Sequence, residues 1–323
     1  MNSHLCAYPF LKHVFRALSL ACGVLAIPAA FASDYSEADL DWSFKSGLDR
    51  ESFTKAFTQL TKDGFRIADI ESYRLGRSNT VSTIWTKIGP KDEWRIVMSK
   101  PITEFLDAHK KHQDEGFSLV EFEADRTGAT LHFSGVWLKT EEGLDTEFYF
   151  GMESLEFSNR YGEMADRGYR LVDFEAYESN GKYRHSAVWM KNDEQLEVRF
   201  YRAIPKNTFG EVAASMREAG FRLIDVEGYQ YEGDFVFAGE WVRMAETQST
   251  QFAFDLLADE FYNKNALYSN DGYRLTEFEV YEDHDVVYYA GSWMKGGRDG
   301  APVVEKPKEK KKASSLEKFR SDR

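Results

Sequence analysis

Residues Gly168–Lys191 read GYRLVDFEAYESNGKYRHSAVWMK, and this stretch predicts a β-hairpin. Its first half begins with an aromatic residue and mixes apolar with acidic positions, and its second half ends in Trp-x-Lys. Asn180-Gly181 lies between the halves, and this dipeptide favours the tight two-residue turn that joins antiparallel strands. We therefore expect two paired strands, one on either side of this turn.

The hairpin recurs five times at a constant interval of 52 residues. Its first landmark is a glycine before an aromatic residue, and its second is a tryptophan two residues before a lysine or arginine. The landmarks lie at Gly64, Gly116, Gly168, Gly220 and Gly272, and at Trp85, Trp137, Trp189, Trp241 and Trp293. A fixed period over several copies is typical of repeat proteins, in which each unit packs against its neighbours.

The turn also predicts a register for the hairpin. Counting outward from Asn180-Gly181 places Glu175 opposite Ser186 and Val172 opposite Trp189. Because side chains alternate across a strand, one face carries Val172, Phe174, Ala187 and Trp189, and the other carries Leu171, Asp173, Glu175, Tyr177 and Ser186. We expect the apolar face, with the tryptophan of every unit, to pack beneath a helix.

The remainder of each unit predicts one further strand and one helix. An apolar pattern of helical spacing begins once per period, at Phe53, Phe105, Phe157, Phe209 and Phe261. The recurring glycine follows as the C-terminal end of this helix. Trp42–Phe44 aligns with Trp94–Ile96, which we interpret as the strand before the next helix, so the array begins in mid-repeat.

We predict an α+β fold of five tandem βαββ units over residues 42–295. The strand at the beginning of the array is expected to complete the last unit at its end. The units are therefore expected to close into a propeller-like toroid. An open repeat solenoid is the alternative.

The N-terminus predicts export from the cytoplasm. Residues 1–32 carry a lysine and an arginine, an apolar run over residues 17–30, and small residues around Ala32, the pattern of a cleaved secretory signal. We expect cleavage near Ala32 and a periplasmic or extracellular protein. Both cysteines, Cys6 and Cys22, lie inside the signal, so the exported chain is expected to form no disulfide and no thiolate metal site.

The flanks of the repeats are polar. We expect residues 33–41 to be a short lead-in, and the lysine-rich segment 296–323 to be a disordered tail with at most a weak contact with the cell envelope. The chain has a formal net charge of −13, and its repeat region is more acidic still because the signal and the tail are basic. This balance argues against a nucleic-acid partner. No segment after the signal is long and apolar enough to predict a transmembrane helix.

Paired carboxylates recur once per unit. Each of Glu71, Glu123, Glu175, Glu227 and Glu279 lies two residues after Asp69, Glu121, Asp173, Asp225 or Glu277. On a strand this spacing places both side chains on one face. In a closed toroid the pairs would line a central funnel and bind a divalent or polycationic ligand. Alternatively, they pair with Arg66, Arg170, Arg222 and Arg274 and with the basic residues of the Trp-x-Lys motif, Lys87, Lys139, Lys191, Arg243 and Lys295.

Other motifs that carry chemistry are explained more simply by structure. Ser-x-x-Lys, the pattern of β-lactamase-type nucleophiles, occurs at Ser52–Lys55, Ser292–Lys295 and Ser315–Lys318, and Ser52 lies where a helix N-cap is expected. His109 and His112 have a helical spacing suited to a metal, but their columns hold apolar residues in other units, so we expect core or core-edge histidines. We predict no catalytic residue, no metal and no cofactor.

The unit resembles the bacterial tandem repeat family that is also described as the polyglycine-hydrolase-like structural repeat. The resemblance rests on the aromatic-led strand, the Asp-x-Glu pair or its near equivalent, and the strand that closes on Trp-x-Lys, and it covers nearly all of residues 42–295. In that family similar repeats occur beside a serine hydrolase domain of β-lactamase type and also alone. Because a short tail follows the fifth unit here, the resemblance implies a secreted repeat protein without that hydrolase domain.

These observations predict an exported, non-enzymatic repeat scaffold that binds a protein, peptide or glycan. The alternative is a periplasmic or secreted hydrolase, acting on glycans or dependent on a metal, that uses the repeated carboxylates. A catalytic centre would require one unit to differ from the others. The departures from the pattern, at Ser118, Asp125, Arg184-His185 and Glu240, are scattered among the units, which favours the scaffold.

Overall fold

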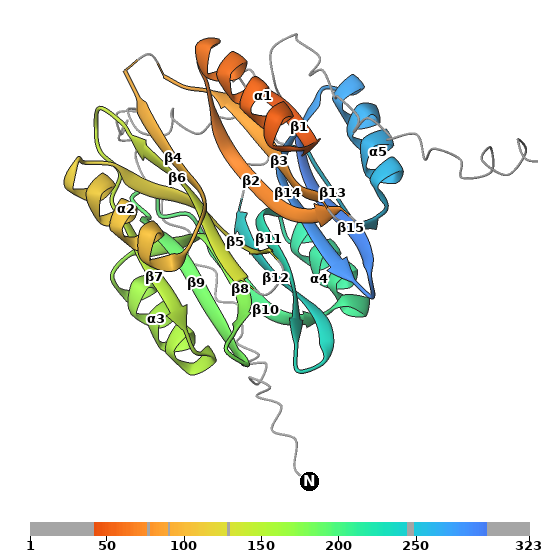
Figure 1. Cartoon of the computed structure of the whole chain (residues 1–323). Helices are drawn as coiled ribbons and strands as arrows, with labels where there is room; N and C mark the ends of the chain where they lie inside the picture. The colour runs from red at the N-terminus through yellow and green to blue at the C-terminus, as the bar shows by residue number, and fades with distance from the viewer. Residues whose placement is uncertain (1–41, 76–77, 90, 128–129, 244–248, 296–323) are drawn as a thin grey trace, which may run out of the picture.

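The computed structural model describes residues 42–75, 78–89, 91–127, 130–243 and 249–295 of the chain (Figure 1). The predicted signal (1–32), lead-in (33–41) and basic tail (296–323) lie outside the described residues. No helix in this described part of the chain is long and apolar enough to cross a bilayer.

The described residues form five units of the same construction, each with a strand, a helix and the two strands of the predicted hairpin. The first two units comprise β1 (Trp42–Leu48), α1 (Arg50–Lys62), β2 (Phe65–Leu75) and β3 (Ser78–Lys87), and β4 (Glu93–Lys100), α2 (Ile102–Asp114), β5 (Ser118–Thr127) and β6 (Thr130–Lys139). The third comprises β7 (Thr146–Met152), α3 (Ser154–Asp166), β8 (Tyr169–Ser179) and β9 (Lys182–Lys191). The last two comprise β10 (Val198–Pro205), α4 (Lys206–Glu218), β11 (Phe221–Tyr231) and β12 (Asp234–Arg243), and β13 (Thr250–Leu256), α5 (Ala258–Asn270), β14 (Tyr273–Asp283) and β15 (Val286–Lys295). The predicted βαββ repeat is confirmed.

Each unit folds into one antiparallel sheet of three strands. The last strand of the unit lies in the middle, as in the order β1-β3-β2. β1 therefore pairs within its own unit, and the expectation that it completes the fifth unit is wrong. The connections from β1 through α1 into β2 are short, so β1 lies beside the hairpin that directly follows it in the chain.

The helices lie on the outside of the molecule and the second strand of each unit lies at its centre (Figure 1). We call these second strands, β2, β5, β8, β11 and β14, the inner strands. Each inner strand lies next to that of the following unit, and β14 lies next to β2. The units thus contact one another in chain order, and the fifth also contacts the first.

The hairpin register agrees with the prediction up to a β-bulge. Glu175 lies opposite Ser186, as expected. Trp189 lies opposite Leu171 and not opposite Val172, because Val172 is the extra residue of the bulge. The same shift occurs in the other four units. It moves Leu171 to the apolar side of the sheet and leaves the acidic pair on the other side.

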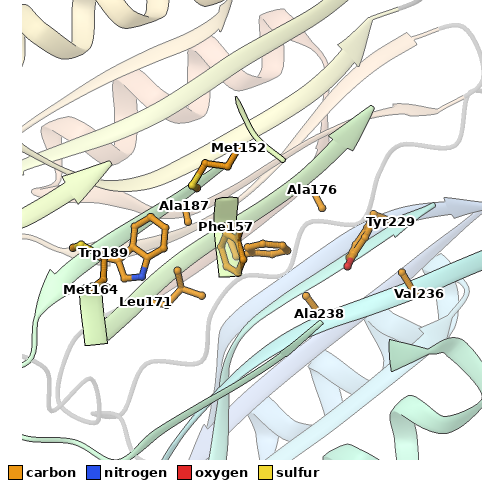
Figure 2. Packing of buried hydrophobic residues seen from close by; sticks show 11 residues of the cluster. Met152, Phe157, Met164, Leu171, Ala176, Ala187, Trp189, Tyr229, Val236 and Ala238 are labelled. Atoms are coloured by element: carbon orange, nitrogen blue, oxygen red, sulfur yellow. The ribbon is translucent and has the colours of Figure 1, made fainter. Parts of the chain in front are cut away.

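The tryptophan column is buried, as predicted. Each of the five tryptophans is at most 1% exposed. In the third unit Trp189 packs with Phe157 and Met164 of α3 (Figure 2). The same cluster contains Tyr229, Val236 and Ala238 of the fourth unit. Burial of apolar surface therefore holds neighbouring units together as well as each unit.

His109 and His112 are partly buried and pack against a tryptophan of this column, which confirms the prediction of core or core-edge histidines. The Trp137 Nε1–H group donates a hydrogen bond to His109 Nδ1 at 3.1 Å. The ring of His112 lies 4.9 Å from that of Trp137 between centroids. Burial lowers the pKa of His109 to about 4, so this imidazole is neutral and serves as an acceptor.

The first strand of each unit contains an irregularity with positive φ near its end. The position holds Gly47, Ser99, Gly151, Ala203 and Asp255, with φ between 48° and 69°. In the first three units its N–H donates to the serine hydroxyl of Ser82, Ser134 or Ser186 at 3.0 to 3.1 Å. The equivalent column holds Ala238 and Ala290 in the last two units, where the hydroxyls of Tyr229 and Tyr281 accept the bond at 3.0 and 2.9 Å.

Two tyrosine variants test whether a tyrosine hydroxyl accepts this N–H bond in the units that lack the serine. Tyr229→Phe leaves the N–H of Ala203 without an acceptor, so we expect the free energy of unfolding to fall by about 1–3 kcal/mol. Tyr177 bonds Ser186 at 2.7 Å, and Ser186 still accepts from Gly151 in its absence. Tyr177→Phe should therefore cost less, about 0.5–1.5 kcal/mol. Denaturant unfolding followed by circular dichroism measures both, and a larger loss for Tyr177→Phe would contradict the assignment.

Candidate functional site

Ten carboxyl groups meet where the five inner strands face one another. The first layer comprises Asp69, Glu121, Asp173, Asp225 and Glu277, and the second layer, two residues further along each strand, comprises Glu71, Glu123, Glu175, Glu227 and Glu279. The structure thus brings together every residue that was predicted to bind a ligand. Nine of the ten line a cavity of about 30 Å³. A cavity of this volume holds about two water molecules.

The second-layer carboxylates accept hydrogen bonds from the backbone of the neighbouring inner strand. The N–H groups of Ser72, Ala124, Ala176, Gly228 and Val280 donate to Glu123, Glu175, Glu227, Glu279 and Glu71 at 3.2, 3.3, 3.3, 3.2 and 3.4 Å, respectively. An inner strand forms the edge of its own sheet, where N–H groups lack a partner strand. The carboxylates of the next unit supply the missing acceptors.

In the first layer, the aspartates make this contact and the glutamates do not. Asp69 accepts from the Phe278 N–H at 3.1 Å, Asp173 accepts from Phe122, and Asp225 accepts from Phe174. Glu121 and Glu277 are longer by one methylene group. Within the described ranges, no backbone N–H group donates a hydrogen bond to either glutamate. Both carboxyl groups line the cavity.

Burial and mutual repulsion favour the protonated form of these groups. Burial is the largest cause that raises each pKa, and repulsion from nearby carboxylates adds to it at most positions. The pKa of Asp225 rises to about 7 and that of Glu279 to about 8, although backbone N–H bonds act in the opposite direction at both. The cluster therefore retains protons at neutral pH that isolated carboxylates release.

The basic column of the Trp-x-Lys motif lies elsewhere, so its predicted pairing with the carboxylates is wrong. Lys87 and Lys191 donate at 2.7 Å to the carbonyls of Asp63 and Arg167, at the ends of α1 and α3. Lys139 and Arg243 make the same contact in their units. Each cation also lies over the aromatic ring that follows the recurring glycine. The motif ends its strand beside the helix C-terminus, where a cation is favourable.

Two members of the arginine column, Arg66 and Arg170, contact groups outside the carboxylate cluster. Arg66 donates to the carbonyl of Ile67 at 3.0 Å, and Arg170 lies 3.9 Å from the sulfur of Met190. The main influences on the pKa values of the ten carboxyls are burial, backbone N–H bonds and other carboxyls. For Arg66 and Arg170 these contacts replace the predicted pairing with the carboxylates.

One further carboxylate, Glu240, flanks the cluster at the junction of the third and fourth units. It is fully buried opposite Asp225, in a column that elsewhere holds Ile84, Val136, Val188 and Ser292. Neither of its carboxylate oxygens has a hydrogen-bond partner in the described part of the chain. Burial raises the pKa of Glu240, and the charge of Arg170 opposes this rise. The sequence shows a charge in an apolar column here, but not the groups that surround it.

The remaining candidate motifs have structural roles where the structure describes them. The N-cap of α1 is Asp49, which accepts from the Ser52 N–H at 2.9 Å, so the expectation that Ser52 caps the helix is wrong. Ser292 is buried and donates to the carbonyl of Leu223 at 3.2 Å. Ser315–Lys318 lies outside the described residues. No group of three or more His, Cys, Asp and Glu side chains in the described ranges is arranged to hold a metal ion.

Alanine substitutions separate the two kinds of first-layer carboxylate. Asp173→Ala leaves the N–H of Phe122 without an acceptor, so we expect a loss of about 1–3 kcal/mol in the free energy of unfolding at neutral pH. Glu121→Ala removes an acidic group and breaks no backbone bond, so stability should stay the same or rise. Asp173→Asn keeps an acceptor oxygen and should retain most of the stability. Equal destabilisation by both alanine variants would contradict the role of the backbone bond.

Comparison with known families identifies the repeat. The family described as polyglycine hydrolase-like, structural repeat, matches residues 39–88, 143–192, 198–244 and 248–296. These segments correspond to the first, third, fourth and fifth units, and the second unit has the same fold although it departs from the pattern at Ser118 and Asp125. Comparison with curated proteins finds no match. Because the matched segments cover more than half of the chain, it belongs to the polyglycine hydrolase-like structural repeat family.

Proposed function

We propose that this protein is an exported, non-enzymatic repeat scaffold whose five units close into a propeller-like toroid. The observation that carries the proposal is the contact between the first and fifth units. Asp69 and Glu71 accept backbone N–H bonds from Phe278 and Val280 at 3.1 and 3.4 Å. These bonds are the same as those between consecutive units, so the two ends of the array meet as the units inside it do.

Apolar packing between the first and fifth units also supports closure. The ring of Phe44 lies edge-on to Phe261 and Phe278, with centroid distances of 5.7 and 5.2 Å. Ile84 of the first unit is 3% exposed within the same cluster. An open solenoid would expose these side chains and the carboxylates of β2 to water, which is unfavourable for the apolar groups.

The central carboxylates support a structural role over a catalytic one. Eight of the ten accept a backbone N–H bond from a neighbouring unit. Glycoside hydrolysis requires two carboxyl groups on either side of a bound sugar. The cavity of about 30 Å³ is far smaller than a sugar ring, because it holds about two water molecules.

The small volume of the central cavity limits the ligands that the carboxylates can bind. We propose that they bind protons, water or at most a small cation. A protein, peptide or glycan partner would then bind to the outer surface of the scaffold, whose geometry the closed arrangement keeps constant. Export rests on the sequence pattern of residues 1–32.

A circular permutant tests closure. It joins Lys295 to Trp42 by a linker as long as residues 88–92, which connect the first two units, and it opens the chain between β6 and β7. In a closed toroid the first and fifth units meet as consecutive units do, so the permutant should fold with a midpoint of thermal unfolding within about 5 °C of the parent, or about 2 kcal/mol. The parent with the same linker at its C-terminus is the control. A permutant that fails to fold while this control folds would contradict closure.

Expression of the full chain in a Gram-negative host tests export and the absence of turnover. We expect the protein in the periplasmic fraction with Ser33 as its N-terminal residue, because the predicted cleavage follows Ala32. We also expect the recovered protein to release no reducing ends from purified peptidoglycan. An uncleaved chain in the cytoplasm would contradict export.

The control for catalysis is the double variant Glu121→Gln with Glu277→Gln. These two carboxyls line the cavity and accept no backbone N–H bond in the described ranges, so they are the best placed to act on a ligand. Release of reducing ends by the parent, lost in the folded double variant, would contradict the scaffold and favour a hydrolase.

A further inference from the structure

Three positions of the repeat change residue type from unit to unit, whereas the tryptophans and the helix phenylalanines stay constant. One position lies in the first strand of each unit and holds Ser46, Met98, Phe150, Arg202 and Phe254. Another lies in the middle strand and holds Val81, Phe133, His185, Phe237 and Tyr289. The third lies in the helix and holds Thr54, Leu106, Ser158, Gly210 and Tyr262. The first-strand residue of one unit meets the other positions of the unit before it.

At the junction of the fourth and fifth units, a large residue of the strand meets a glycine of the helix. The ring of Phe254 lies 5.8 Å from that of Phe237 and 5.5 Å from that of Phe209 between centroids. A Cβ atom at Gly210 would lie 3.2 Å from two ring carbons of Phe254, which is closer than ordinary contact. The ring is also stacked on Phe252 at 5.8 Å, so it has little room to move away. The glycine therefore makes space for the residue of the following unit.

The junction of the fifth and first units reverses these sizes. Here the helix carries the large residue, Tyr262, and the strand carries the small one, Ser46. The two hydroxyls lie 2.6 Å apart, and Ser46 is also hydrogen-bonded to Ser82 at 2.9 Å. The ring of Tyr262 lies 6.2 Å from that of Tyr289. Ser46 and Tyr262 are both buried, so a larger residue at position 46 would collide with the tyrosine.

The junction of the third and fourth units is polar at the same positions. Arg202 Nη1 lies 2.8 Å from His185 Nε2. Arg202 Nη2 donates to the hydroxyl of Ser158 and to the carbonyl of Ser154, both at 2.8 Å. Opposite Phe237 and Gly210, the same arginine would face a ring and a glycine in place of these acceptors. Burying it there would be unfavourable.

The two remaining junctions are apolar. Phe150 of the third unit meets Phe133 of the second, with a centroid distance of 5.1 Å. Met98 of the second unit and Val81 of the first belong to one apolar cluster. Each first-strand residue is thus matched in polarity to the unit that precedes it, and at the two junctions that involve the fifth unit it is matched in size as well.

We propose that these positions specify which units can pack together, and that Tyr262 and Ser46 direct the fifth unit to the first. The constant features of the repeat, such as the tryptophans, would allow any unit to pack against any other. Misassembly of units is a characteristic failure of repeat proteins. A mismatched pair, such as Tyr262 with Phe254, would bring two large side chains to one place and so disfavour the wrong neighbour. The role of Tyr262 and Ser46 rests on the closed toroid proposed above, whereas the other matches join consecutive units.

Gly210→Ala tests the match between the fourth and fifth units. The added Cβ crowds Phe254, so we expect the midpoint of thermal unfolding to fall by about 2 °C or more, although alanine is the better helix former. In a Phe254→Leu background the ring is absent, and the same substitution should raise the midpoint by about 2 °C. Gly162→Ala is the control, because nothing in the described part of the chain lies within 4 Å of its added Cβ. It should raise the midpoint in both backgrounds.

A double-mutant cycle tests the match between the fifth and first units. Ser46→Phe overfills this junction and Tyr262→Gly leaves a cavity, so each should lower the midpoint of thermal unfolding. Together they copy the pair Phe254 and Gly210. The double variant should therefore lose less than the sum of the two losses, by about 3 °C or more. If Ser46→Phe fails to fold, Ser46→Leu replaces it with the same expectation.

The control for this cycle combines Ser46→Phe with Ser158→Gly, which changes the same helix position at another junction. Its losses should add within about 2 °C. An effect of Gly210→Ala that is the same with and without the ring of Phe254 would overturn the matching of units. A match there, together with losses from Ser46→Phe and Tyr262→Gly that simply add, would overturn the closed arrangement and with it the role of this pair.

Discussion

The fold depends on hydrogen bonds from the backbone N–H groups of each inner strand to the carboxylates of a neighbouring unit. An inner strand pairs with the middle strand of its own sheet and leaves its other edge open. An open edge normally invites another strand to pair with it. Here the acidic side chains occupy that edge, so five separate sheets meet without merging into one. The consequence is a concentration of buried carboxyls at the centre, which is tolerated because many of them keep their protons.

The other recurring side chains serve the interior of each unit. The tryptophans fill the space beneath the helices, and the basic residue that follows bonds the last helical carbonyl, as Lys87 does at Asp63. A serine or tyrosine hydroxyl accepts the N–H at the irregularity of each first strand, as Ser186 and Tyr229 do. Nearly every residue that repeats is thus used in construction. This use is consistent with a protein that presents a surface of constant geometry.

Asymmetry enters through a few substitutions near the centre. Glu121 and Glu277 replace the aspartate of the first layer and line the cavity. Glu240 replaces an apolar residue and places a buried carboxylate near Arg170, at the junction of the third and fourth units. The first and fifth units meet without a connecting segment among the described residues. A repeat of uniform sequence would not distinguish its junctions, whereas these differences do.

The sequence by itself determined the period, the order of elements, the buried tryptophans and the core position of His109, because turn, helix and face preferences act over a few residues. It did not reveal the bulge at Val172, which depends on how the sheet twists, or the cap at Asp49. It placed the ten carboxylates on one face, but only the tertiary structure decided what they bond. Phe278 and Asp69 are 209 positions apart in the chain. Their contact uses a backbone N–H group, which nearly every residue carries, so no pattern of side chains could have indicated it.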